Sequence, residues 1–549
     1  MLGVALAVML AAAACSSEGN DSSDTTTAST NGAPATDASA STDAAPSTDS
    51  AHSNDAATPD TEPASSGLTK DDVEASLPEL DNVVQTAMAE TGVPGIAVAV
   101  VFDDEVLYTQ GYGVREVDGD DPIEPETIFQ LASLSKPISS TIMAGAVGQG
   151  IFDWNDPVFG YNPALELSDA YVTENVTFAD LFSHRSGIPA GGGDVLEAIG
   201  YDRTEVLRRL RYLELNPFRT TSGYSNFGMT AGGESAAIAA GIAWEELADE
   251  ILFNPVGMTS TSMHYSDYES AANRAELHVS TESGWEAAFD RMPDAQAPAG
   301  GVSSNVIDLA QWLRLQLAAG QIDGEQIIDE EALDLTHTTM ILKGPPTPTI
   351  ADSPKSYGLG WNIEVDATGA TRWNHSGAFS TGASTTAKLL PAEGLGIVVL
   401  TNGEPLGVPE AITDAYFDQI QTGSWPEDIF TVWTERFSGL YGEPKEFEDL
   451  GDGAAPALDN AAYVGTYTND YVGDVEVIVV DGDLEVVAGP AAVTYILTHF
   501  DANTFTYIHD PELPDFLESA VFEIGPDGIA TALTMSGFDV DGLGTFQRI

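Results

Sequence analysis

The segment Ser133-Leu134-Ser135-Lys136 constrains the local fold of this 549-residue chain more than any other. It precedes a small and apolar run, Ile138 to Ile151, that is long enough for a helix of roughly three to four turns. Residues three apart lie on one face of a helix, so the lysine amine would reach the serine hydroxyl. Among the six lysines of the chain, only Lys136 has a serine three positions upstream. The segment therefore predicts a helix start that pairs a hydroxyl with an amine.

The position of Ser133 at this helix start has two interpretations. Pro137 suits the first turn, where the backbone amides have no partner within the helix. The positive end of the helix dipole would then point at Ser133 and stabilise an alkoxide or an oxyanion. Alternatively, Ser133 only caps the helix, as serines commonly do. The tetrapeptide alone does not decide between a nucleophile and a cap.

Two further motifs follow in the chain. Tyr224-Ser225-Asn226 supplies a phenol and an amide, and His375-Ser376-Gly377 lies between an extended segment and the run 387–390. Tyr467-Thr468-Asn469 repeats the Tyr-x-Asn pattern, but it lies after the histidine motif. The order of the other three motifs predicts one active site assembled from three distant stretches.

These motifs, in this order, resemble those of the serine beta-lactamase and penicillin-binding-protein superfamily. The resemblance is to the branch of class C beta-lactamases, D,D-peptidases, D-aminopeptidases and esterases, and it covers roughly residues 75–420. Further segments appear in the family's order: Val93 to Ala97, Asp156 to Val158, Leu181 to Gly187, Asn254 to Met258, Pro298 to Gly301 and Tyr357 to Trp361.

The resemblance implies an α+β catalytic domain over residues 70–420. Its antiparallel sheet is flanked by helices, with an all-α insert that carries Tyr224, and the segment 138–320 is largely helical. His375 would lie on the strand that borders the cleft. Strands near the N-terminus would pair with late ones, and the segments concerned are Ile96 to Phe102, Val106 to Gly111, Thr385 to Leu390 and Gly396 to Thr401.

A serine hydroxyl needs a neighbouring base, and Lys136 and Tyr224 are the candidates. Lysine can act only if burial or nearby charge lowers its pKa, and an adjacent ammonium would in turn lower the pKa of the tyrosine. The two groups titrate together, so the sequence does not assign the proton. By resemblance, Asn226 orients Lys136 and contacts the substrate amide.

The resemblance also implies where the oxyanion is held. The backbone amides of Ser133 and Ala378 would donate to it, with Gly377 beside them, and each donor contributes roughly 3 kcal/mol in comparable enzymes. Water activated at Tyr224 would then hydrolyse the acyl-enzyme. The shape of the substrate pocket would depend on the loops Ser186 to Asp194 and Thr338 to Ser353.

His375 stands where most beta-lactamases have the lysine of Lys-Thr-Gly. An unperturbed histidine is mostly neutral at pH 7, so the cation that would hold a penicillin carboxylate is missing. This favours a peptidase or carboxylesterase over a beta-lactamase. His375 has an alternative role as a strand histidine satisfied by the backbone. A third possibility is a catalytically silent surface protein that kept the fold for binding.

Other hydrolytic chemistries lack their motifs in this sequence. It contains no Gly-x-Ser-x-Gly nucleophile elbow, no His-Glu-x-x-His helix and no spaced Cys/His cluster. We therefore expect no metal site and no cofactor. His184, beside Arg185, is interpreted as structural, fixing a loop that faces the nucleophile helix.

The N-terminus predicts export. Residues 1–14 have the form of a signal peptide whose apolar core is too short to span a bilayer, followed by Cys15, the only cysteine. Lipid attachment at Cys15 would make the membrane anchor and place the protein outside the cytoplasm. Ala12 replaces the usual leucine of a lipobox, and no basic residue precedes the apolar core, so cleavage by ordinary signal peptidase and secretion is the alternative.

Residues 15–69 predict a disordered tether. Positions 16–68 are mostly Ser, Thr, Ala, Asp, Pro and Gly, with no aromatic Phe, Trp or Tyr and no Lys or Arg, so they cannot bury enough apolar surface to fold. The net charge of −67 disfavours nucleic acid and anionic membranes as partners. A small peptide, amide or ester is the expected partner, and the cluster Arg208, Arg209 and Arg211 is interpreted as a solvated helix face paired with acids.

The last part of the chain has a different pattern. Short alternating runs over residues 460–549, with an Asp481-Gly482 turn, predict an antiparallel barrel that resembles the lipocalin-like domains of some D-amino-acid peptidases. Residues 421–459 would connect it to the catalytic domain. A packing appendage without a ligand is at least as well supported as a binding domain. The expected strands are 474–480, 484–487, 493–498, 504–508, 521–524 and 531–535.

Overall fold

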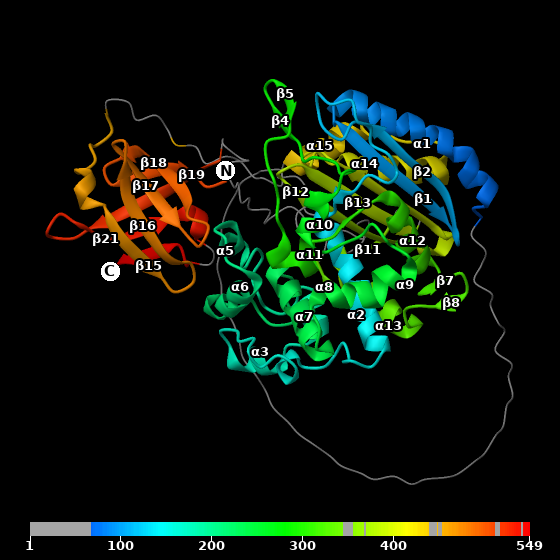
Figure 1. Cartoon of the computed structure of the whole chain (residues 1–549), viewed down its shortest axis with the longest axis horizontal. Coiled ribbons are helices and arrows are strands. Elements are labelled where there is room, and N and C mark those ends of the chain that lie inside the picture. Colours follow the sequence, from blue (N-terminus) through cyan, green and yellow to red (C-terminus); the bar gives the residue numbers. More distant parts are fainter. Residues whose placement is uncertain are drawn as a thin grey trace, which may run out of the picture.

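The computed structural model describes residues 67–343, 355–366, 369–438, 447, 453–510, 516–539 and 542–549 (Figure 1). The predicted signal peptide, Cys15 and almost all of the predicted tether lie outside the described residues. So does most of the second predicted pocket loop, at residues 344–353. The signal peptide, the lipid anchor and the tether therefore stay predictions.

An eight-stranded antiparallel sheet forms the centre of the larger domain. The N-terminal strand β1 pairs with β14 (Val98 opposite Val399), and β14 pairs with β13, so the predicted joining of early and late strands is confirmed. In spatial order the strands are β2 (Glu105–Gly113), β1 (Gly95–Phe102), β14 (Leu395–Thr401), β13 (Ala383–Leu390), β12 (Thr371–Phe379), β11 (Asn362–Val365), β10 (Ser356–Tyr357) and β9 (Ile341–Leu342).

Both faces of this sheet are covered, because every residue of its central strands β1, β14 and β13 is buried. β1 shows the division clearly: Ala97, Ala99 and Val101 pack into one hydrophobic core, while Val98 and Val100 pack into the other. The second core lies under α1 (Lys70–Thr91), α14 (Val408–Thr422) and α15 (Ile429–Ser438). Alternate side chains of one strand thus pack against two helical layers, one on each face of the sheet.

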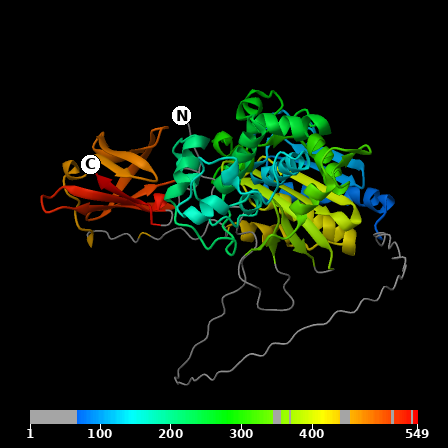
Figure 2. The same ribbon diagram turned by 90° about the horizontal axis from the view of Figure 1, so that it is seen from below.

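The other face of the sheet carries α12 (Val306–Leu317) and the predicted helical insert, which confirms the α+β fold (Figures 1 and 2). The described residues also form three short strand pairs outside the main sheet: β3 (Phe129–Gln130) with β6 (Ser303–Ser304), β4 (Val279–Thr281) with β5 (Gly284–Glu286), and β7 (Gln321–Ile322) with β8 (Glu325–Gln326). The helices are α2 (Ser135–Gly148), α3 (Ala170–Asn175), α4 (Phe178–Phe182), α5 (Asp194–Ala198), α6 (Arg203–Arg209), α7 (Asn226–Ala240), α8 (Trp244–Ala248), α9 (Asn254–Val256), α10 (Tyr265–Ser270), α11 (Ala297–Gly300) and α13 (Glu330–Asp334).

The segment predicted as a connection begins with structure of its own. Helix α15 lies within it, and Ile429 and Phe430 are buried in the same core as Val408 and Ile412 of α14. The helix was not predicted, because the Gly, Pro and acidic residues of the segment indicated a connection and the apolar spacing within residues 429–438 was not recognised.

The C-terminal domain is a closed barrel of eight antiparallel strands, the up-and-down architecture that lipocalins share, so the predicted barrel is confirmed. Asp481 and Gly482 both have positive φ, at 52° and 105°, as the predicted tight turn requires. The first and last strands, which close the barrel, were not predicted. The strands are β15 (Gly465–Asn469), β16 (Gly473–Val480), β17 (Asp483–Ala488), β18 (Val493–Asp501), β19 (Thr504–Ile508), β20 (Leu517–Ile524), β21 (Ala530–Met535) and β22 (Thr545–Arg548).

The arginine cluster at the end of α6 and on the 3-10 turn after it is paired with acids, as predicted. Arg208 and Arg209 both bind Glu205, and Arg211 binds Glu166. Arg209 is not a solvated side chain, however, because it also donates to the backbone oxygen of Tyr471 in the barrel at 2.6 Å. Within the described part of the chain, no helix is both long enough and apolar enough to cross a bilayer.

Candidate active site

Ser133 lies on a 3-10 turn, Ala132–Leu134, that leads directly into α2. The residue at the N-cap of α2 is Leu134, and no side chain caps the helix there, so the interpretation of Ser133 as a simple cap is wrong. Throughout residues 131–146 only Ser133 is not buried. The apolar run therefore anchors the helix while leaving one hydroxyl accessible.

The structure brings the three predicted catalytic side chains together. The Ser133 hydroxyl oxygen lies 2.9 Å from the Lys136 amine and accepts a hydrogen bond from the Tyr224 hydroxyl at 3.0 Å. The amine also lies 4.7 Å from the centre of the Tyr224 ring. A hydroxyl in contact with an amine and a phenol is the arrangement that nucleophilic catalysis requires.

Lys136 is fully buried, and burial lowers its pKa to about 7, with Asp194 opposing the shift. The amine donates to the side-chain oxygen of Asn226 at 2.7 Å and to the backbone oxygen of Ala299 at 3.0 Å. Asn226 therefore lies where the sequence predicted. Ala299 was noted only as part of the Pro298 to Gly301 segment, and a backbone carbonyl leaves no signal in a sequence.

Tyr224 and Asn226 are positioned by the start of α7. The Ser225 hydroxyl, between them, accepts from the Gly228 amide at 2.9 Å and caps the helix. The Ser225 amide in turn donates to His184 Nδ1 at 3.3 Å, and the His184 ring lies 4.5 Å from that of Tyr224. His184 thus holds the tyrosine in place, in agreement with its predicted structural role.

The expectation that a neighbouring ammonium lowers the pKa of Tyr224 is wrong. Burial is the largest effect and raises this pKa, and Asp194 raises it further, while the hydrogen bond with Ser133 opposes them. The phenol therefore keeps its proton in the resting site.

Asp194 is a buried acid behind the site that the sequence did not single out beyond ending a predicted loop. Its Oδ1 accepts from the Asn226 amide at 3.3 Å. Burial, with Glu197 nearby, raises the pKa of Asp194 well above its usual value, while Asn226 and Lys136 oppose the rise. The chain contains 86 acidic residues, and no pattern in the sequence distinguishes Asp194 from the others.

The third motif lies against the nucleophile turn. A Cβ added to Gly377 would lie 2.0 Å from the backbone oxygen of Leu131 and 2.7 Å from the backbone nitrogen of Leu134. The Thr385 hydroxyl on the next strand donates to the same Leu131 oxygen at 2.8 Å. Glycine is needed at 377 because the two backbones touch there, and this contact holds the end of β12, which includes Ala378, against the nucleophile turn.

His375 is buried, and its two ring nitrogens have partners within the protein. Its Nδ1 lies 2.7 Å from the backbone oxygen of Ser376, which can only accept, so Nδ1 carries the proton and Nε2 accepts from the Tyr357 hydroxyl at 3.0 Å. Burial holds the pKa of His375 well below its usual value, and the positive charges of Lys136 and Lys343 add to this effect. The geometry matches the alternative role, that of a strand histidine with internal partners.

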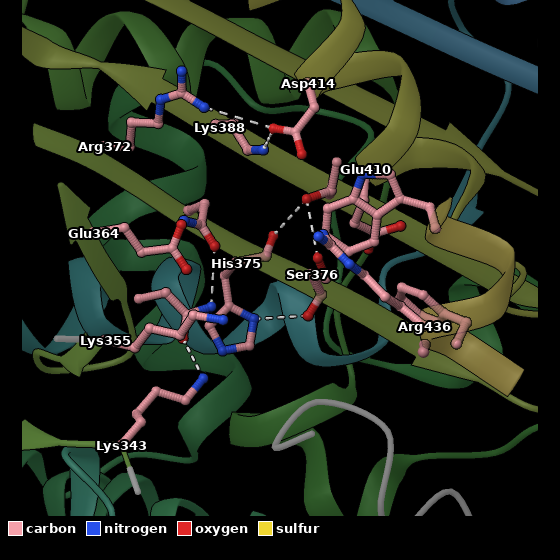
Figure 3. Close-up of a pocket in the computed structure, with 16 residues that line it drawn as sticks. Lys343, Lys355, Glu364, Arg372, His375, Ser376, Lys388, Glu410, Asp414 and Arg436 are labelled. Carbon is pink, nitrogen blue, oxygen red and sulfur yellow. Dashed lines mark hydrogen bonds and ion pairs between the residues drawn. The ribbon is translucent and has the colours of Figure 1, made fainter. Parts of the chain in front are cut away.

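Beside the same strand lies a polar cavity of about 180 Å³. Figure 3 shows Glu410 and Asp414 reaching it from one side and Lys343 and Lys355 from the other. Asp414 pairs with Lys388 inside this cavity. Strand β12 therefore contacts the nucleophile turn at Gly377 and, together with α14, also lines this separate polar cavity.

Glu410→Gln is expected to change how stability depends on pH. Burial raises the pKa of Glu410 to about 7, while an unfolded chain has the ordinary value of 4.5. Between these values the folded state holds a proton that the unfolded state has lost, so stability falls as pH rises through this window. The variant should gain about 2–3 kcal/mol relative to wild type on going from pH 5 to pH 8, measured by urea denaturation.

Glu435→Gln is the matched control, because Glu435 is exposed on the neighbouring helix α15. Its difference from wild type should be the same at both pH values. If the difference between Glu410→Gln and wild type is also the same at pH 5 and pH 8, folding does not raise the pKa of Glu410.

The beta-lactamase family profile matches residues 80–420, and the profile of a domain of unknown function (DUF3471) matches residues 451–547. By fold, the chain is similar to the octameric penicillin-binding protein homologue from Pyrococcus abyssi, with a TM-score of 0.56 and 21% identity, covering 84% of this chain and 98% of that one.

Several relatives with assigned activities are similar in sequence. Unguisins hydrolase ungD of Aspergillus violaceofuscus is 25% identical over 505 residues, covering 83% of this chain and 87% of the relative. Unguisins hydrolase ungD' of Aspergillus campestris is 26% identical over 350 residues, which are 61% of this chain but only 63% of that relative. The D-alanyl-D-alanine-carboxypeptidase/endopeptidase AmpH of Escherichia coli is 23% identical, covering 60% of this chain and 85% of the relative.

The family profile covers well over half of the chain, and the fold of the same residues is the α+β arrangement expected from the motifs. The relatives include proteins named as hydrolases and as penicillin-binding proteins. The chain therefore belongs to the beta-lactamase family, within the superfamily of serine hydrolases and penicillin-binding proteins.

Proposed function

We propose that this protein is a serine hydrolase that forms an acyl-enzyme at Ser133 with amide or ester substrates, as a peptidase or carboxylesterase. One observation carries the proposal: the only accessible residue of the 131–146 segment is a hydroxyl in contact with a buried amine and a phenol. Membership of a hydrolase family supports it.

Lys136 is the proposed base for acylation. A neutral amine has two N–H groups and one lone pair. The acceptors Asn226 Oδ1 and Ala299 O engage both N–H groups, so the lone pair faces the Ser133 hydroxyl. Because burial lowers the pKa of Lys136 to about 7, a large share of the molecules hold this neutral form at neutral pH. The amine takes the proton as the Ser133 oxygen bonds to the substrate carbonyl carbon.

Tyr224 is the proposed proton donor to the leaving group. Its hydroxyl points at the Ser133 oxygen and keeps its proton, so it can protonate the departing amine or alcohol and be reprotonated from Lys136. Hydrolysis of the acyl-enzyme then uses the same proton transfers in the reverse direction: water takes the place of the leaving group and gives its proton to Tyr224, Tyr224 passes its own proton to Lys136, and Lys136 returns it to the Ser133 oxygen. The developing oxyanion would accept from the amides of Ser133 and Ala378, a placement supported by the close contact of Gly377 with the nucleophile turn.

The class of substrate follows from the third motif and the relatives. A neutral His375 gives no permanent cation for a penicillin carboxylate, and AmpH and the unguisins hydrolases are named for hydrolysis of other compounds. A small peptide or amide, or an ester, is therefore proposed. Beta-lactamase activity is the second candidate, because a beta-lactamase of Providencia stuartii is 23% identical over 62% of this chain. Turnover of nitrocefin distinguishes the two.

We further propose that the protein works outside the cytoplasm, held by a lipid on Cys15, with residues 15–69 as the spacer. The support is the sequence of residues 1–15. Metabolic labelling with a fatty-acid probe would detect the anchor, and Cys15→Ser should release the protein into the medium.

Intact-mass spectrometry tests the catalytic proposal. Wild type is incubated with a fluorophosphonate, D-Ala-D-Ala peptides, D-amino amides, short acyl esters and beta-lactams. We expect a covalent adduct from the fluorophosphonate and from at least one amide or ester, and none in Ser133→Ala. No adduct from any compound would instead favour a catalytically silent binding protein.

A further inference from the structure

The C-terminal barrel contacts the catalytic domain through two of its loops. The loop before β16 and the loop before β18 touch α5, α6 and the residues between them (Figures 1 and 2). The Tyr201 hydroxyl donates to the Val472 oxygen at 3.0 Å, and the Ala491 amide donates to the Ile199 oxygen at 3.1 Å. Tyr471 and Ile199 are fully buried, so the contact excludes water.

One hydrogen bond across this interface reaches the residue next to the buried acid behind the active site. The Gly193 amide donates to the Tyr471 hydroxyl oxygen at 2.8 Å. Gly193 has a φ of 102° and immediately precedes Asp194, the buried acid behind the active site. Two residues earlier, the Gly191 amide donates to the backbone oxygen of Tyr224 at 3.1 Å. The barrel thus binds the short segment that supports both motif residues, Tyr224 and Asn226.

From Gly193 the contacts continue to the nucleophile. Asp194 Oδ1 accepts from Asn226 Nδ2 at 3.3 Å, and Asn226 Oδ1 accepts from Lys136 at 2.7 Å. An amide has one donor end and one acceptor end, so the carboxylate on one side makes Asn226 present its oxygen to the amine. Asp194 also acts directly on Lys136 by raising its pKa. The position of Asp194 therefore affects both the orientation and the charge of the base.

The barrel side of this contact is held firmly. Asn469 Oδ1 accepts from the amides of Tyr471 and Val472 at 2.8 and 2.9 Å, while its Nδ2 donates to the backbone oxygens of Leu543 and Thr545. Asn469 belongs to the Tyr467-Thr468-Asn469 segment that repeats the active-site pattern in the sequence. Here it fixes the loop that presents Tyr471 to the catalytic domain.

We propose that Tyr471 is a positioning residue for the reaction and that the barrel is a working part of the active site. By binding the Gly193 amide, Tyr471 fixes the position of Asp194. Asp194 in turn fixes the orientation of the Asn226 amide, which holds the amine of Lys136 in place. This inference rests on the proposed acylation of Ser133 and adds the barrel to it. A barrel that served only as a packing appendage would not need to reach this segment.

Tyr471→Phe tests the proposal, because it keeps the ring and removes the hydroxyl that accepts from the Gly193 amide. We expect kinact for the fluorophosphonate probe to fall about tenfold with KI unchanged, since the change affects the base and not probe binding. Hydrogen exchange in a peptide covering residues 188–195 should also become faster. The matched control is Tyr201→Phe, which breaks the neighbouring bond to Val472 and should leave kinact within twofold of wild type.

A double-mutant cycle with Asp194→Asn separates positioning from a general loss of stability. If Tyr471 acts through Asp194, Tyr471→Phe should have little further effect on kinact in the Asp194→Asn background. A full tenfold effect in that background, or equal kinact values for Tyr471→Phe and Tyr201→Phe, would overturn the proposal. If wild type itself forms no adduct, the proposed function fails. If wild type reacts and Tyr471→Phe reacts as fast, only the role of the barrel fails.

Discussion

Lys136→Met should slow the acylation of Ser133 by roughly 10²- to 10⁴-fold, the range that removal of a general base costs. Among the described residues, only the amine both contacts the Ser133 oxygen and has a pKa near neutrality, at about 7, while burial raises the pKa of Tyr224. Methionine keeps the length and apolar stem of the side chain, so the buried site should stay filled. The rate of labelling by a fluorophosphonate measures the effect.

The same base should determine the pH dependence of the wild type. Only the neutral amine can accept the proton, so the labelling rate should rise with pH, pass its midpoint at about pH 7 and then level off. Because Asp194 raises the pKa of Lys136, Asp194→Asn should move this midpoint to lower pH.

Lys136→Arg is the matched control for charge. Arginine keeps a cation beside Ser133 but holds its proton at every accessible pH, so it should be as slow as Lys136→Met. Rapid labelling of either variant with an unchanged pH midpoint would rule out Lys136 as the base and direct attention to Tyr224.

Gly377→Ala should reduce both stability and acylation. The new methyl group would meet the Leu131 oxygen and the Leu134 nitrogen, and both are backbone atoms that cannot turn aside. We expect the free energy of unfolding to fall by roughly 3 kcal/mol. Separation of β12 from the nucleophile turn should also displace the Ala378 amide and slow labelling by roughly 10²-fold, the cost of one oxyanion donor. Urea denaturation and labelling kinetics measure the two effects.

Gly396→Ala is the control in the same sheet. A Cβ at Gly396 in β14 would lie 3.5 Å from the side chain of Leu317, an ordinary contact, so stability should change by less than about 1 kcal/mol. If Gly377→Ala behaves like Gly396→Ala, the close contact between the third motif and the nucleophile turn does not matter to the enzyme.

Much of this protein follows from local pattern. The serine three residues before Lys136, the turn residues Asp481-Gly482 and the alternation of apolar residues along β16 are written in neighbouring positions, so they predict a helix start, a turn and a strand. The resemblance of the motifs also placed Tyr224 and Asn226 beside Lys136, which the structure shows.

Tertiary structure decided the properties that depend on distant neighbours. Burial sets the pKa of Lys136 below its usual value and that of Tyr224 above it, and the two shifts favour the lysine as the base. Asp194 and the carbonyl of Ala299 became part of the site only when the chain folded around the amine. Tyr471, 278 residues from Gly193 in the sequence, contacts it only through the packing of two domains. Charge, burial and contact across domains are sums over the whole fold, so no short stretch of sequence contains them.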